Sequence, residues 1–98
     1  MVKGKTSTGF EFNYDERILD DYALLEAIGR FDESNSKVSQ VKALTDMIDY
    51  ILGESKQKFM EHIADKNDGF RPIEAMKDEL VEIITASKNL KNSPSSHG

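Results

Sequence analysis

The feature of this sequence that most constrains its fold is a change in the spacing of apolar residues near residue 20. Residues 9–14 read GFEFNY, so that Phe10, Phe12 and Tyr14 alternate with polar or acidic residues. A spacing of two places these three side chains on one face of a β-strand. After residue 20 the apolar residues recur every three or four positions, which is the spacing of an amphipathic helix. The change predicts a short stretch of β-structure followed by helices.

The β-structure is expected to be a hairpin over residues 2–14. Residues 2–6 form a weaker strand pattern, and Ser7, Thr8 and Gly9 provide turn-forming residues between the two strands. Because an isolated two-stranded hairpin is only marginally stable in water, this hairpin must pack on the helices.

Apolar stripes and capping residues indicate four helical segments. We expect helices over residues 20–32, 36–52, 54–65 and 72–87. Asp20 or Asp21 is available to cap the first helix, Gly53 ends the second, and Pro72 suits the first position of the last. The residues expected to face inward are Leu24, Leu25, Ile28, Phe31, Val38, Val41, Leu44, Ile48, Ile51, Phe59, Met60, Ile63, Ile73, Met76, Leu80, Ile83 and Ile84.

The length of the chain limits it to one domain, because 98 residues build a single core. We predict an α+β, mainly helical fold over residues 1–87, in which the N-terminal β-hairpin packs on a bundle of about four helices. Residues 88–98 are polar and turn-rich and offer almost nothing to bury, so they are expected to form a disordered tail.

The charge balance argues against nucleic-acid binding. The chain has 13 Lys and Arg residues against 18 Asp and Glu residues, and the basic residues are spread along it with acidic residues between them. The net charge of -5 therefore repels a phosphate backbone. No apolar run approaches the roughly 18 residues that a membrane span needs, and the absence of cysteine removes disulfides and thiolate metal sites. We expect a cytoplasmic protein that binds neither nucleic acid nor membrane.

One segment begins like a calcium-binding loop. Residues 65–70 read DKNDGF and follow a predicted helix, but such a loop needs glycine at position 6 and a bidentate Glu at position 12. Here Gly69 falls at position 5 and Met76 at position 12. His62 and His97 each lack a second histidine at helical spacing. We therefore expect a glycine turn from Asp65 to Gly69 and no metal or cofactor.

The sequence shows no catalytic constellation. Acidic residues that are neighbours in sequence do not face one another on a helix, so solvated faces and helix caps explain them. These pairs are Asp15-Glu16, Asp20-Asp21, Asp32-Glu33 and Asp78-Glu79. Without a glycine-rich phosphate loop or a nucleophile beside a base, the chain is not expected to be an enzyme.

Four apolar or aromatic residues lie away from the apolar stripes of their helices. At about 100° per residue, Tyr22, Met47, Tyr50 and Val81 are each roughly a right angle or more from the centre of their stripe. One interpretation is that the core of a small bundle wraps widely enough to cover them. The other is that they form a protein interface and are exposed in the monomer.

Several segments of the chain resemble one known family. Residues 8–27, TGFEFNYDERILDDYALLEA, resemble the N-terminal part of tail assembly chaperones from long-tailed phages and prophages of Gram-positive bacteria. The stretches ILGE, DGFRPIE and ELVEII, at residues 51–54, 68–74 and 79–84, are similar to later helices of that family in the same order. The likeness covers most of residues 8–92.

The resemblance implies a non-enzymatic function in the host cytoplasm. Proteins of that family bind the long, helical tape measure protein, keep it soluble and help to recruit tail tube subunits. The family offers no motif of binding residues to transfer, so the expected interface is still Tyr22, Met47, Tyr50 and Val81. The same surface suits a homo-oligomer. The alternative is a small acidic adaptor or regulator that binds a single globular host or phage protein.

Overall fold

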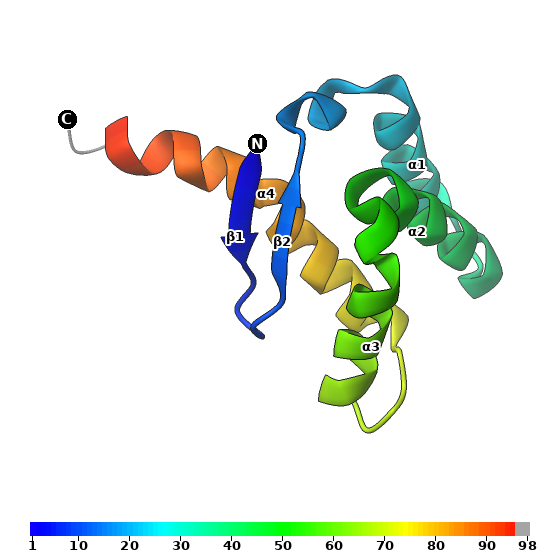
Figure 1. Cartoon of the computed structure of the whole chain (residues 1–98). Helices are drawn as coiled ribbons and strands as arrows, with labels where there is room; N and C mark the ends of the chain where they lie inside the picture. The colour runs from blue at the N-terminus through cyan, green and yellow to red at the C-terminus, as the bar shows by residue number, and fades with distance from the viewer. Residues whose placement is uncertain (96–98) are drawn as a thin grey trace.

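A computed structural model describes the backbone of residues 1–95 and the side chains of residues 1–87. Two antiparallel strands come first, and four α-helices follow. The elements are β1 (Val2–Lys5), β2 (Glu11–Tyr14), α1 (Tyr22–Glu33), α2 (Lys37–Leu52), α3 (Lys56–Lys66) and α4 (Ile73–Ser95), with 3₁₀-helical turns at Glu16–Asp20 and Gly53–Ser55. The predicted α+β, mainly helical fold is confirmed (Figure 1).

The hairpin buries the face that the alternating pattern predicts. Val2 pairs with Tyr14 and Gly4 with Phe12 in the antiparallel register, and the aromatic side chains of Phe10, Phe12 and Tyr14 are all buried. A Cβ atom on Gly4 would lie 2.9 Å from the ring of Phe12. A side chain at this position would therefore force the Phe12 ring to shift, and glycine on β1 leaves room for the ring of the opposite residue.

The capping residues set the helix boundaries as expected. The Asp21 carboxylate accepts a hydrogen bond from the Ala23 N–H at 2.8 Å and caps α1, and Ser36 caps α2 by accepting from the Ser39 N–H. Gly53 ends α2 with a positive φ of 50°. Each of these caps satisfies backbone groups that have no partner within the helix.

The last helix is longer than predicted. α4 continues to Ser95 instead of ending at residue 87. No glycine or proline interrupts residues 73–93, so nothing in the backbone chemistry stops the helix earlier. The backbone is therefore helical to Ser95, past the predicted helix end at residue 87, and residues 96–98 of the expected tail lie outside the described residues.

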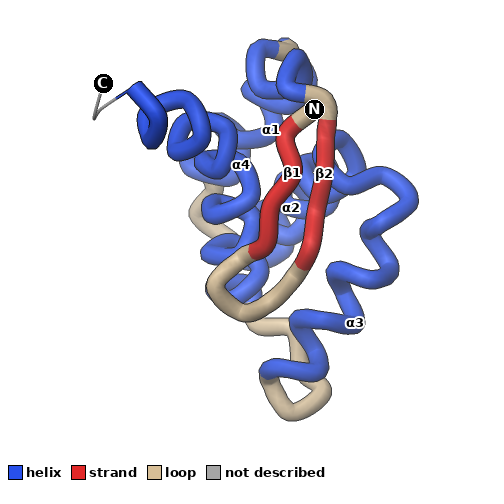
Figure 2. The backbone as a smooth tube through the Cα atoms, turned by 60° about the vertical axis from the view of Figure 1, so that its left-hand side comes forward, coloured by secondary structure: helices blue, strands red, loops and turns tan. Residues whose placement is uncertain are grey.

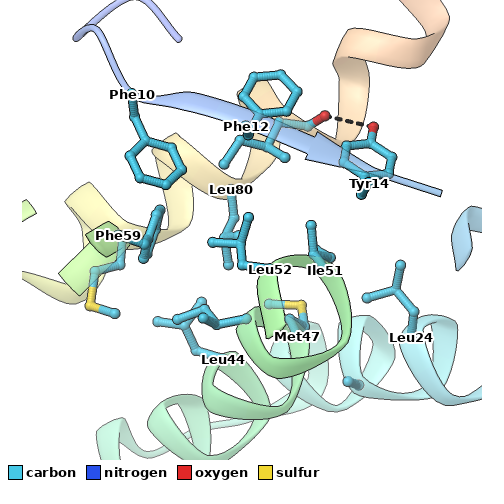
Figure 3. Close-up of a cluster of buried hydrophobic side chains, with 14 of the residues drawn as sticks. Phe10, Phe12, Tyr14, Leu24, Leu44, Met47, Ile51, Leu52, Phe59 and Leu80 are labelled. Carbon is cyan, nitrogen blue, oxygen red and sulfur yellow. Dashed lines mark hydrogen bonds between the residues drawn. The ribbon is translucent and has the colours of Figure 1, made fainter. Parts of the chain in front are cut away.

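The hairpin and the helices enclose one core. Figure 2 shows the hairpin lying over the helices, with β1 beside α4, and β2 also contacts α2. In the close-up of Figure 3, Phe10, which directly precedes β2, points toward Phe59 of α3, and Leu80 of α4 and Leu52 of α2 belong to the same buried cluster. The Tyr14 hydroxyl donates a hydrogen bond to the Ile83 carbonyl oxygen at 2.8 Å and joins the end of the hairpin to α4.

Three of the residues expected to face inward are exposed. Leu25 on α1 and Val38 and Val41 on α2 reach solvent, and the buried part of α2 begins only at Ala43. In the first two turns of α2, Val38 and Val41 lie on the same helix face as the buried residues, but these turns extend beyond the end of the core. Including Val38 and Val41 in the predicted stripe moved its centre away from Met47, which is why Met47 was expected outside.

Candidate protein-binding groove

An apolar groove lies where α1, α2 and α4 meet. It encloses about 250 Å³. Its apolar lining consists of Ile28, Phe31, Met47, Leu80, Val81 and Ile84. Asp32, Lys77 and Thr85 are its polar residues. Because a cavity of ~150 Å³ with such a lining binds benzene, this groove has room for large apolar side chains.

The groove forms because α1 and α4 both pack on α2 and leave a gap between them. Met47 on α2 is its floor, and Leu80 and Met47 point into the same part of the core in Figure 3. Ile28, Phe31 and Ile84 are only partly buried against that core. Their remaining apolar surface is in contact with water, and covering it would stabilise a complex.

Two of the four predicted interface residues line this groove. Val81 is 49% exposed at its edge, as expected. Met47 is only 5% exposed, so its predicted exposure is wrong: it lies on the same face as Leu44 and Ile51 and contributes to the floor. Tyr22 and Tyr50 are exposed as predicted, but neither lines the groove.

The cation at the groove is already engaged within α4. Lys77 Nζ lies 2.8 Å from the Glu74 carboxylate and 3.8 Å from that of Asp78. Its hydrogen bond with Glu74 raises the pKa of Lys77 and lowers the pKa of Glu74. Both groups therefore stay charged near neutral pH and largely offset each other at this end of the groove.

A buried carboxylate that was not predicted from the sequence lies on the side of α4 opposite the groove. Glu79 is 4% exposed, and its Oε2 accepts hydrogen bonds from Thr6 Oγ1 at 2.6 Å and Thr8 Oγ1 at 2.7 Å. The prediction of a solvated face for Glu79 is wrong because the hairpin turn covers it. A signal was present, since Glu79 is three residues after Met76 and four before Ile83, on the predicted inner face.

His62 completes this cluster without forming a catalytic triad. Its Nε2 lies 2.8 Å from Thr8 Oγ1 and 3.6 Å from Glu79 Oε2. Thr8 donates its single hydroxyl proton to Glu79, so His62 Nε2–H donates to Thr8. In a triad the acid binds the other ring nitrogen and the nucleophile donates to the histidine. This cluster instead fastens the hairpin turn to α3 and α4, and Ser7 adds two hydrogen bonds of 2.7 Å to Glu82.

Replacing Glu79 by Ala is expected to lower the free energy of unfolding by about 1–3 kcal/mol, because the Thr6 hydroxyl is left buried without its acceptor. Thermal and urea unfolding would measure the change. Asp78→Ala is the matched control, since its side chain is exposed on the preceding position of α4. Equal stability of the two variants would contradict a structural role for Glu79.

The other hollows are less suited to an apolar ligand. One of about 960 Å³ lies between the hairpin and α3 and carries both signs of charge, with Lys3, Lys58, Glu61 and Asp65 among its lining. Among the residues that the structure describes, no three His, Asp or Glu side chains are grouped to hold a metal ion.

The segment that begins like a calcium loop forms a glycine turn, as predicted. Asp68 and Gly69 have φ angles of 57° and 87°, and the Gly69 N–H donates to the Ala64 carbonyl oxygen at 2.7 Å. A residue of left-handed conformation that returns its N–H to the preceding helix is a common helix end. The turn therefore ends α3.

Comparison with known proteins identifies no relative of this chain. No family model, no curated protein and no solved structure matches the chain. Within residues 1–95, none of the helices has both the length and the apolar composition needed to cross a lipid bilayer. The groove geometry and the resemblance of the sequence are therefore the observations on which a function can be argued.

Proposed function

We propose that the protein is a non-catalytic tail assembly chaperone, which binds an apolar helix face of the tape measure protein in the groove between α1 and α4 and promotes tail tube assembly. The observation that carries the proposal is this groove, in which the buried side chains of Met47 and Leu80 lie beneath four apolar side chains that reach solvent, Ile28, Phe31, Val81 and Ile84. The resemblance of residues 8–92 supplies the identity of the partner.

The dimensions of the groove suit a helix. On α4 its wall runs from Lys77 to Thr85, a rise of about 12 Å at ~1.5 Å per residue, which is slightly more than two helical turns. An amphipathic helix laid into such a groove inserts apolar residues at positions i, i+3 or i+4 and i+7. A tape measure protein, as a long helical chain, contains many such faces. The net charge of -5 helps keep such an assembly soluble.

The second candidate function is that of an adaptor that binds one globular protein. The same groove supports it, because a single helix on a folded partner has the same apolar face as a helix of a long fibrous protein. The two functions differ in the protein that binds the groove in a cell. Identifying that protein therefore distinguishes them.

Co-expression with the tape measure protein encoded by the same phage or prophage tests the proposal. We expect the tagged chain to recover it in the soluble fraction, and Val81→Asp to abolish most of this recovery by placing a charge in the groove. Val38→Asp is the matched control, an exposed valine on α2 outside the groove. Failure of the unmodified chain to hold the tape measure protein in solution would refute the proposal, and recovery of one globular protein would favour the adaptor.

A further inference from the structure

The charges at the edges of the groove are not balanced. Asp32 lines it on α1, is exposed, and forms neither a hydrogen bond nor an ion pair with any residue that the structure describes. It shares a face of α1 with Ile28 and Leu25, four and seven residues earlier, so its carboxylate lies at the edge of the apolar surface. An anion beside an apolar surface attracts a cation on whatever covers that surface.

The cations on the walls of the groove are engaged elsewhere. Arg30 is the basic residue of α1, and it binds Glu26 and Asp46, each at 2.7 Å. Lys77 is the basic residue in the first 15 residues of α4, and it binds Glu74 and Asp78. Neither is available to neutralise Asp32 without losing a carboxylate partner. The charge that remains at the groove is therefore negative.

We infer that the groove is selective for a basic amphipathic helix, one whose apolar stripe is flanked by Lys or Arg that pairs with Asp32. This inference rests on the proposed function, because it presumes that a helix occupies the groove. A cation on the helix keeps most of its hydration at the open edge while its apolar neighbours fill the space over Met47 and Leu80. A flanking Glu in the same position would face Asp32 and repel it.

A second copy of the chain fits this groove less well. Two copies that met through the same face would bring the two Asp32 carboxylates and two chains of net charge -5 together. Charge complementarity therefore favours a different partner with basic residues. Sedimentation of the free chain tests this alternative, since self-association that Val81→Asp abolishes would overturn the inference.

Three helical peptides of about 18 residues provide the experiment. They share one leucine stripe at heptad spacing, and their flanking positions carry Lys, Gln or Glu. Fluorescence anisotropy measures their binding to the whole chain at low and at high salt. We expect the Lys peptide to bind about tenfold more tightly than the Glu peptide at low salt, with the ratio falling as salt screens the charges.

Two variants separate the role of Asp32 from that of net charge. Asp32→Asn is expected to reduce the preference for the Lys peptide over the Glu peptide from about tenfold to about twofold at low salt. Glu33→Gln removes the same charge from the next position of α1, about 100° around the helix, and should retain the preference. Equal binding of the Lys and Glu peptides, or an unaltered preference in Asp32→Asn, would overturn the inference.

The outcome also distinguishes this inference from the proposed function. If all three peptides bind equally and Val81→Asp abolishes their binding, the groove accepts helices and only the charge preference is wrong. If none of the peptides binds, or if binding is unaffected by Val81→Asp, the groove is not the helix site and both the inference and the proposed function lose their basis.

Discussion

Replacing Phe59 by Ala is expected to lower the free energy of unfolding by about 3–5 kcal/mol. The ring of Phe59 is fully buried and packs edge-on against that of Phe10, with 5.4 Å between the ring centroids and 81° between their planes. The substitution removes this contact between α3 and the hairpin and leaves a cavity that the surrounding backbone cannot fill. Urea unfolding followed by circular dichroism measures the loss.

Phe70→Ala is the matched control for this prediction. Phe70 is 72% exposed in the loop between α3 and α4, so its removal should change stability by no more than about 0.5 kcal/mol. The two variants remove the same atoms, from a buried position on α3 and from an exposed position in a loop. If Phe59→Ala were as stable as Phe70→Ala, the packing of α3 against the hairpin would be contradicted.

Replacing Ile48 or Leu80 by Ala is expected to destabilise the domain by about 2–5 kcal/mol. Both side chains are 1% exposed, on the facing sides of α2 and α4. Ile48 is the clearer test, because Leu80 also lines the groove and its variant would change binding as well as folding. Thermal unfolding of each variant would show the effect.

Exposed valines on the same helices serve as controls. Val38→Ala on α2 and Val81→Ala on α4 should unfold close to the temperature of the unmodified chain, since both side chains are in contact with water. A loss of stability in Val38→Ala comparable to that in Ile48→Ala would mean that the inner face of α2 has been assigned to the wrong residues.

The parts of the fold that depend on local chemistry could be predicted from the sequence. Asp21 and Ser36 begin helices because their side-chain oxygens accept backbone N–H groups two or three residues later. Gly53 and Gly69 end helices with positive φ angles, which glycine adopts without strain. The alternating aromatic residues placed the buried face of the hairpin correctly. Each of these features is determined by a few consecutive residues.

The parts that depend on the length of the core could not be predicted in this way. An apolar stripe identifies the face of a helix that is buried, but it does not show where along the helix the neighbouring element ends. Val41 and Met47 illustrate the difference, because Val41 lies before the core begins and Met47 lies within it. The groove could not be located from the sequence for the same reason. Surplus apolar residues indicated that an interface exists, but its walls come from α1 and α4, which are far apart in sequence.

The hydrogen bonds between the hairpin and α4 determine when the chain can finish folding. The bond from Thr6 to Glu79 spans 73 residues, and that from Tyr14 to Ile83 spans 69. During synthesis the hairpin is made first and can meet α2 and α3, but its contacts with α4 form only after α4 leaves the ribosome. Contacts of such long sequence separation form late and slowly. Any binding surface that includes both α1 and α4 is therefore incomplete in the nascent chain, so the groove cannot hold a partner before residue 85 has left the ribosome.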